Sequence, residues 1–188
     1  DKSGVFSAGR LAEAVDIYQN MIEDGATIFM GVGGALVPGG LRQVLAEAIS
    51  DDLVDVMVTT GANVTHDLIE SFGGHHLRGE PMVDDAKLRR RGISRIYDAY
   101  VPQRAFELFE DRIQPMLAEV TKVGTRMSSA KLLREIGLRL DDQNSFLSAA
   151  AKHEVPVFAP ALADSILGLQ AWLYSQDHEL IIDSLLDV

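Results

Sequence analysis

The residues best suited to bind a ligand lie in one short stretch, residues 56–67, which reads Val-Met-Val-Thr-Thr-Gly-Ala-Asn-Val-Thr-His-Asp. Its apolar, β-branched beginning is typical of a buried strand, and the break at glycine delivers a polar loop to the end of that strand. Thr59 and Thr60 supply hydroxyl groups, and Gly61 lets a ligand approach the main chain. Ligands of open α/β folds bind beyond the carboxyl ends of the strands, so this loop is our first candidate for a site.

His66 and Asp67 follow the loop on a predicted helix, which we expect Thr65 to cap. Adjacent residues on a helix point about 100° apart, so these two side chains do not form a catalytic pair with each other. Each could still hydrogen-bond a ligand at the end of the strand. For His66, a structural role in the protein interior is the alternative.

A glycine-rich loop follows an earlier apolar run, residues 27–30, and contains Gly31, Gly33 and Gly34. A dinucleotide-binding motif of the G-x-G-x-x-G type has a third glycine where this chain has Leu36, so that standard motif is absent. No lysine follows a glycine loop in the manner of a P-loop. The glycines therefore either admit a ligand or only permit a tight turn.

An acidic residue, Asp164, comes just after a further apolar run at residues 155–160. An acid placed just past a buried strand is how nucleotide sites hold ribose hydroxyl groups. A role as the N-cap of the next helix is the competing interpretation.

The remaining polar or aromatic candidates give weaker indications of a functional site. The two histidines at 75–76 lack the spacing and the further ligands of a metal site, so we expect no bound metal. The two aspartates at 84–85 are typical of a solvated turn, and the three arginines at 89–91 suit a solvated face, a phosphate or a subunit contact. Trp172 is expected to pack in the core or an interface, with a ligand pocket as the alternative.

Composition narrows the class of protein. The chain has 188 residues, of which 47% are hydrophobic, and its lack of cysteine excludes disulfide scaffolds, zinc ribbons and thiol catalysis. A formal net charge of -11 argues against a nucleic-acid duplex as partner. The longest uncharged stretch, residues 26–41, is too rich in glycine for a membrane span. We expect a cytoplasmic protein with no nucleic-acid or membrane partner.

The periodicity of apolar residues alternates between helix and strand along most of the chain. Helices are predicted at 10–24, 41–49, 65–72, 104–120, 130–140 and 144–152, and strands at 27–30, 54–60, 96–101 and 155–160. We expect the first helix to pack by one apolar face and residues 73–95 to form a long surface excursion. The alternation predicts an α/β fold, a parallel sheet flanked by helices, in a single domain over residues 1–188.

Several segments together resemble the deoxyhypusine synthase family, particularly its bacterial members. They occur in the family's order and cover most of the chain: residues 58–62, 66–69, 88–96, 101–102, 109–110 and 156–164. The resemblance implies a Rossmann-like fold, NAD as cofactor and a homotetramer with active sites between subunits. It also implies the family's chemistry, in which an aminobutyl group passes from spermidine to an acceptor amine, such as a protein lysine, through an imine on an enzyme lysine.

The resemblance assigns cofactor contacts to particular residues. The segment from Thr59 to Ala62 resembles the family's NAD-contacting loop, and Asp164 resembles an acid of the cofactor pocket. Gly33 and Gly34 stand in the first loop, where many members have hydroxyl or amide side chains. His66 stands where eukaryotic members carry a glutamate, and we include it among the cofactor contacts.

Two departures from the family pattern bear on activity. Leu169 occupies a position where family members carry an acid that binds the polyamine. Without that carboxylate a substrate ammonium loses a partner, so spermidine need not be the donor. The lysines, at residues 2, 87, 122, 131 and 152, match no catalytic position of the family. We therefore expect an incomplete portion of a longer domain, inactive alone, with the lysine outside this chain. The alternative is a non-catalytic, cofactor-binding or regulatory homologue that pairs with an active subunit.

Overall fold

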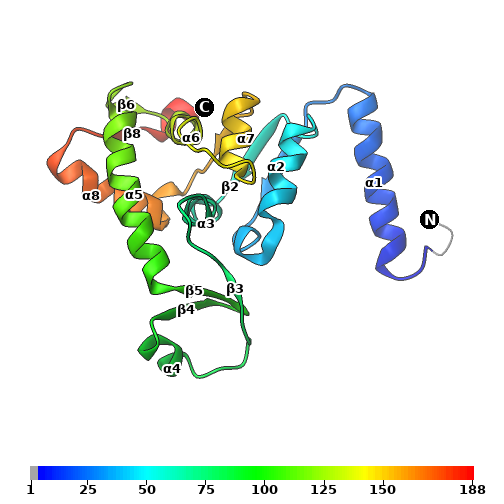
Figure 1. Cartoon of the computed structure of the whole chain (residues 1–188). Helices are drawn as coiled ribbons and strands as arrows, with labels where there is room; N and C mark the ends of the chain where they lie inside the picture. Colours follow the sequence, from blue (N-terminus) through cyan, green and yellow to red (C-terminus); the bar gives the residue numbers. More distant parts are fainter. Residues whose placement is uncertain (1–3) are drawn as a thin grey trace.

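The computed structural model describes residues 4–188 (Figure 1). The helices are α1 (Ser7–Glu23), α2 (Arg42–Ser50), α3 (Gly61–Ser71), α4 (Asp85–Arg90), α5 (Gln103–Thr121), α6 (Ser129–Gly137), α7 (Phe146–Lys152) and α8 (Ile166–Asp177). The strands are β1 (Phe29–Val32), β2 (Val56–Thr59), β3 (Leu77–Arg78), β4 (Ile93–Ile96), β5 (Ala99–Pro102), β6 (Arg126–Met127), β7 (Val157–Phe158) and β8 (Ile181–Ile182).

The central sheet is parallel and has the order β1-β2-β7. Side chains alternate between its two faces, as the period of a strand requires. Met57 is fully buried on the face that the helices cover, whereas Phe29 and Val58 point to the other face and are 67% and 36% exposed. The predicted α/β fold with a parallel sheet and flanking helices is confirmed.

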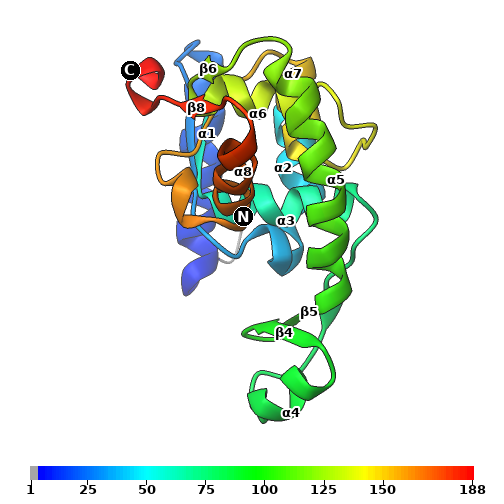
Figure 2. The same ribbon diagram turned by 90° about the vertical axis from the view of Figure 1, so that its left-hand side faces the viewer.

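Helix α3 lies in the middle of the molecule and contacts α5, α7 and α8 (Figures 1 and 2). Val64, Leu68 and Ile69 are completely buried along it, and Phe109 of α5 belongs to the same core. Because α3 follows β2 directly, the packing of this helix fixes the position of the loop at the end of the strand.

The start of α3 differs from the prediction. The helix begins at Gly61, and the hydroxyl of Thr60 caps it by accepting a hydrogen bond from the N–H of Asn63 at 3.3 Å. Thr65, the predicted cap, lies inside the helix and donates its hydroxyl hydrogen to the carbonyl of Gly61 at 2.9 Å. The prediction was wrong because both threonines precede helix-forming residues, and only Thr60 has the extended backbone that an N-cap needs.

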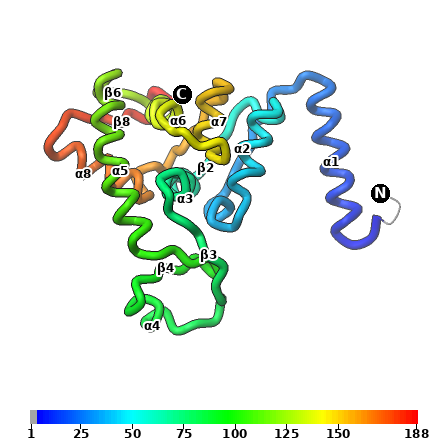
Figure 3. The backbone as a smooth tube through the Cα atoms, in the orientation of Figure 1, coloured from blue at the N-terminus to red at the C-terminus, as the bar shows by residue number. Residues whose placement is uncertain are grey.

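Helix α1 stands apart from the rest of the chain (Figures 1 and 3). Its predicted apolar face is present but not packed, since none of its residues is buried and Leu11 and Val15 are 68% and 56% exposed. One link is the hydrogen bond that the hydroxyl of Tyr18 donates to the carbonyl of Leu53. The expected packing of this helix was therefore wrong for the described chain.

The predicted surface excursion is an ordered arm that projects from the body (Figure 2). It is built on the antiparallel sheet β3-β5-β4, and α4 lies at its tip. The strand predicted at residues 96–101 is interrupted: Ile96 ends β4 and residues 99–101 belong to β5, whereas Tyr97 and Asp98 form the turn of a hairpin between the two strands. Tyr97 has a positive φ of 55°, a conformation typical of a turn.

Serine residues cap three of the later helices. Ser128, Ser145 and Ser165 each accept a hydrogen bond from a backbone N–H in the first turn, of α6, α7 and α8 respectively. The cap of α8 is thus Ser165, not Asp164. Within residues 4–188, no helix combines the length and the apolar character needed to cross a membrane.

Candidate functional site

Parallel strands place the predicted ligand loops at one edge of the sheet. Gly33 and Gly34 follow β1, Thr60 follows β2, and Asp164 lies on a short turn after β7. All four are exposed. The first two loops are close together, since a Cβ built on Gly34 would stand 3.7 Å from the hydroxyl oxygen of Thr60. We name this set of loops the strand-end site.

Thr59, the last residue of β2, lies beneath the loops of the strand-end site and joins β2 to β1. Its side chain is buried, and its hydroxyl donates a hydrogen bond to the carbonyl of Val32 on the neighbouring strand at 3.1 Å. The hydroxyl hydrogen of Thr59 is therefore already used in a hydrogen bond between β2 and β1. Whether Thr59 contacts a cofactor stays a prediction.

Gly61 is required by packing against the loop after β7. A Cβ at this position would lie 2.5 Å from both Cβ and Oγ of Ser165, far inside van der Waals contact. Since Gly61 is buried, its lack of a side chain brings the β2 and β7 loops together. The structure thus gives Gly61 a packing role, and the predicted approach of a ligand to its main chain stays a prediction.

The amino end of α3 presents backbone donors at the same edge. The first N–H groups of a helix have no helical acceptor, and Thr60 satisfies only that of Asn63. Among the described residues the N–H groups of Gly61 and Ala62 make no hydrogen bond, and Ala62 is exposed whereas Gly61 is buried. With the positive end of the helix dipole behind them, they suit a negatively charged group such as a phosphate.

One residue of this region escaped the sequence analysis. Asn63 is completely buried, and its side chain bonds to Gly33 and Val37 in the loop after β1. The available signal was a polar amide in the first turn of a helix, directly before the apolar Val64. Its partners lie about thirty residues away in the chain, so their identity could not be predicted.

His66 leaves the strand-end site and faces the arm. Its Nδ1 lies 2.8 Å from Nε2 of His76, and Nδ1 of His76 lies 2.6 Å from the carboxylate of Glu70. A carboxylate only accepts, so with both rings neutral the hydrogens run from His66 to His76 to Glu70. The structural role that competed in the sequence analysis therefore has direct support, and the cofactor contact stays a prediction.

Burial controls the charge of this array. The pKa of His66 is lowered to about 4, mainly by desolvation and also by the neighbouring His76, while Glu70 opposes the shift. Burial opposes ionisation of Glu70, but the hydrogen bonds from His76 outweigh it and lower the pKa of that carboxyl. At neutral pH His66 is therefore uncharged and Glu70 carries a negative charge.

Asp67 is not available to a ligand. It is completely buried, its Oδ1 accepts from Nε of Arg42 at 2.6 Å, and its Oδ2 accepts from the hydroxyl of Ser145 and the N–H of Leu147. Arg42 also pairs with Asp142. Burial opposes the charge of Arg42, but the two carboxylates outweigh it and raise the pKa of the guanidinium. Asp67 therefore ties α2, α3 and α7 together.

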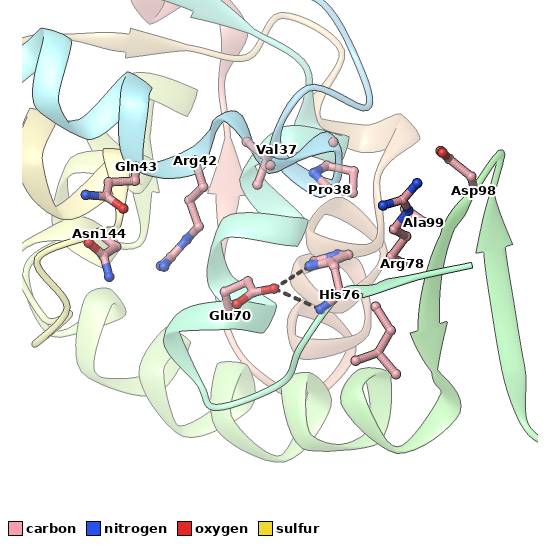
Figure 4. Close-up of a pocket in the computed structure, with 13 residues that line it drawn as sticks. Val37, Pro38, Arg42, Gln43, Glu70, His76, Arg78, Asp98, Ala99 and Asn144 are labelled. Carbon is pink, nitrogen blue, oxygen red and sulfur yellow. Dashed lines mark hydrogen bonds and ion pairs between the residues drawn. The ribbon is translucent and has the colours of Figure 1, made fainter. Parts of the chain in front are cut away.

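A cavity of about 570 Å³ opens beside this charged region, between α2, α3 and the arm (Figure 4). Arg42, Glu70 and His76 face it from the body, and Arg78 and Asp98 face it from the arm. The volume is typical of ligand pockets. Within residues 4–188, no group of three or more His, Cys, Asp or Glu side chains is arranged so that it could hold a metal ion.

The other candidates lie on the surface. Asp84 caps α4, and Asp85 pairs with Arg95 at 2.8 Å, so the predicted solvated turn is a helix start. The arginines at 89–91 are exposed at the end of α4. Trp172 is 56% exposed on α8, so it is not part of the core of the described chain.

Comparison with known proteins identifies the family of the chain. The family model for deoxyhypusine synthase matches residues 1–188. The chain belongs to the deoxyhypusine synthase family. The family recognised from the sequence is thereby confirmed.

Archaeal members of the deoxyhypusine synthase family are similar over nearly the whole chain. "Probable deoxyhypusine synthase 1" of Methanosarcina mazei is 45% identical over 184 residues, which are 97% of this chain and 57% of that protein. "Probable deoxyhypusine synthase" of Methanothermobacter thermautotrophicus is 42% identical over 188 residues, which are 100% of this chain and 61% of that protein. The chain thus spans about 57% to 61% of the length of these relatives.

The fold agrees with a solved structure. A crystal structure assigned to a deoxyhypusine synthase of Entamoeba histolytica superposes with a TM-score of 0.66, at 20% identity, over 86% of this chain and 50% of the other. At this identity the likeness supports the fold alone. It agrees with the Rossmann-like arrangement described above.

Proposed function

We propose that the strand-end site binds NAD and that the protein serves the family's aminobutyl transfer. The observation that carries the proposal is the meeting of three strand ends, after β1, β2 and β7, in a chain of this family. Open α/β sheets bind nucleotides at such an edge.

The residues present fit a dinucleotide. Exposed Gly33 and Gly34 leave the first loop open, because a Cβ on either would meet no atom closer than 3.7 Å. The N–H groups of Gly61 and Ala62 would hold the pyrophosphate. The carboxylate of Asp164 makes no side-chain hydrogen bond within residues 4–188 and would accept from a ribose hydroxyl.

The chemistry proposed is redox-neutral. NAD, when bound, supplies the acceptor for a hydride from the carbon beside the amine of spermidine or a related polyamine. A lysine outside this chain would attack the resulting imine of the donor and expel the rest of the polyamine as a free amine, so that the aminobutyl group is held as an imine on the lysine. The acceptor amine would then displace the lysine, and return of the hydride would reduce the new imine to the product amine. The residues of this chain bind and orient the cofactor, and we assign them no catalytic group.

Cofactor binding is tested by isothermal titration with NAD. We expect saturable binding, and absence of heat at millimolar NAD would reject the cofactor assignment. Mass spectrometry after incubation with NAD, spermidine and candidate acceptors, a free diamine or a protein lysine, tests the transfer. The full-length protein should add an aminobutyl group to one of them.

The domain organisation, the assembly and the location of the protein are proposed from its family membership. We propose that the chain forms one α/β domain that is a portion of a longer domain, because its relatives are longer. We further propose a homotetramer in the cytoplasm, with no nucleic-acid or membrane partner. Sedimentation of the full-length protein tests the assembly, with a single species of four subunits expected.

A second function is favoured by Leu169. This residue is 50% exposed on α8 and stands where the family pattern has an acid for the polyamine. A homologue that binds the cofactor but not the polyamine could pair with an active subunit as a regulatory partner. This function would be favoured over the first if the full-length protein bound NAD and catalysed no aminobutyl transfer alone, but changed the transfer rate of an active relative on mixing.

A further inference from the structure

Asn63 connects the two loops of the strand-end site through a single side chain. It lies in the first turn of α3 and is completely buried. Its Nδ2 donates to the carbonyl of Gly33 at 2.6 Å, and its Oδ1 accepts from the N–H of Val37 at 3.1 Å. The amide therefore binds both ends of the segment from Gly33 to Val37, which includes Gly34.

The same amide reaches the strands beneath the loops. Nδ2 lies 3.2 Å from the hydroxyl oxygen of Thr59 and 3.4 Å from the carbonyl of Val32. The hydroxyl of Thr59 itself donates to that carbonyl, so its lone pairs remain to accept from Asn63. One side chain thus joins the end of β1, its loop, the end of β2 and the start of α3.

Only a carboxamide satisfies this arrangement. It presents a donor and an acceptor on neighbouring atoms, and the partners of Asn63 are carbonyls on one side and an N–H on the other. An ionised aspartate would direct an oxygen at two carbonyl oxygens, and leucine would leave all of these buried groups without a partner.

We propose that Asn63 is a positioning residue that sets the geometry of the cofactor site. The proposal rests on the proposed function, since it assumes that the two joined loops hold NAD. Asn63 does not touch the cofactor, because it is covered on all sides. It acts by holding the loop after β1 against Thr60 before the cofactor arrives, which avoids the cost of ordering that loop on binding.

The test compares two substitutions with a matched control. Asn63→Leu removes every bond of the amide, whereas Ser148→Ala in α7 removes a different buried hydrogen bond, to the carbonyl of Leu140 at 3.3 Å. Isothermal titration should show NAD affinity at least tenfold weaker in the leucine variant and unchanged in the control. Equal affinity in the leucine variant and the wild type would overturn the proposal.

Asn63→Asp separates positioning from a general loss of stability. A carboxyl facing carbonyl oxygens in a buried site has a raised pKa, and once protonated it can again donate to the carbonyl of Gly33. Its NAD affinity, measured relative to the wild type at each pH, should therefore recover as the pH falls from 8 to 5. The leucine variant should show no recovery. If the aspartate variant shows none either, the donated bond is not what positions the loop.

Hydrogen exchange at the N–H of Val37 gives a readout without cofactor. Both Asn63 variants should lose protection there at neutral pH, while Ser148→Ala should retain it. If the wild type does not bind NAD, the proposed function fails, yet this exchange still decides whether Asn63 holds the loop. Unchanged protection in the leucine and aspartate variants would show that Asn63 does not hold it.

Discussion

The amino end of α3 and its later turns differ in the polar groups that they contribute and in what those groups bind. Its amino end, with Thr60, Gly61 and Ala62, contributes neutral groups and backbone N–H donors to the strand-end site. Further along, Asp67 is paired with Arg42, and Glu70 is hydrogen-bonded to His76. The comparison teaches that the polar groups available to a ligand are mostly backbone, whereas the ionisable side chains of the helix hold its neighbours. Four predictions test this contrast.

The largest effect is expected from breaking the buried ion pair. Asp67→Ala leaves Arg42 with one carboxylate and removes the acceptor of Ser145 and Leu147. Loss of one partner of a buried pair costs about 3–5 kcal/mol of unfolding free energy, which urea denaturation would measure. A cost below about 1 kcal/mol would mean that the pair behaves like a surface ion pair and that α3 is held in another way.

The second effect concerns pH. The pKa of His66 is lowered from 6.5 to about 4 in the folded protein, so below pH 6.5 the unfolded chain binds a proton that the folded one does not. Stability is therefore fully present above pH 6.5 and falls as the pH drops toward 4, by at most on the order of 3 kcal/mol. Urea midpoints over this range should decline in the wild type.

A substitution isolates the histidine in that pH profile. Because other carboxyl groups titrate in the same range, the informative quantity is the difference between the wild type and His66→Asn. The asparagine variant should show a shallower decline between pH 6.5 and 4. Identical slopes would assign the pH dependence to other groups, such as Glu70.

The third effect lies at the strand-end site. Gly61→Ala forces a Cβ to within 2.5 Å of Ser165, and such overpacking costs about 1–3 kcal/mol. The loops should also separate and weaken NAD binding. Ser165→Gly in the same chain removes the clash, and glycine at an N-cap costs only a few tenths of a kcal/mol. Thermal unfolding and NAD titration should both recover in the double variant, and no recovery would reject the packing explanation.

The smallest effect on stability is expected from Asp164→Asn. This residue is exposed and has no side-chain hydrogen bond within the described chain, so the unfolding free energy should change by less than about 0.5 kcal/mol. NAD affinity should nevertheless fall about tenfold, because a charged acceptor for a ribose hydroxyl is lost. Asp51→Asn, an exposed aspartate after α2, is the matched control. Equal affinity in both variants would remove Asp164 from the site.

The parallel strands and most helices could be predicted because their signals are local. The apolar run ending at Thr59 and the serine before α6 each specify an element from a few neighbouring residues. The turn at Tyr97 and Asp98 was not predicted, because residues 96–101 are apolar or aromatic except for Asp98 and contain no glycine or proline. The loose position of α1 could not be predicted, because an amphipathic helix indicates that a face can be buried but not what buries it.

The site was predictable in outline only. The edge of the sheet followed from the strand ends, and the residues after β1 and β2 do meet there. The contacts of Asp67 depend on Arg42 and Ser145, which are far away in the chain, and those of His66 depend on His76, ten residues further on. The importance of Asn63 likewise depends on the loop after β1. Sequence spacing cannot supply such contacts, because they form only when the helices pack.

The most direct test of the central claim is a nuclear magnetic resonance titration of the isotope-labelled protein with NAD, read at individual backbone amides. The account predicts that the amide signals of Gly33, Gly34 and Ala62 shift in a saturable manner, while those of His75 and His76 do not. Shifts confined to the cavity between α2, α3 and the arm, or no shifts at millimolar NAD, would contradict it.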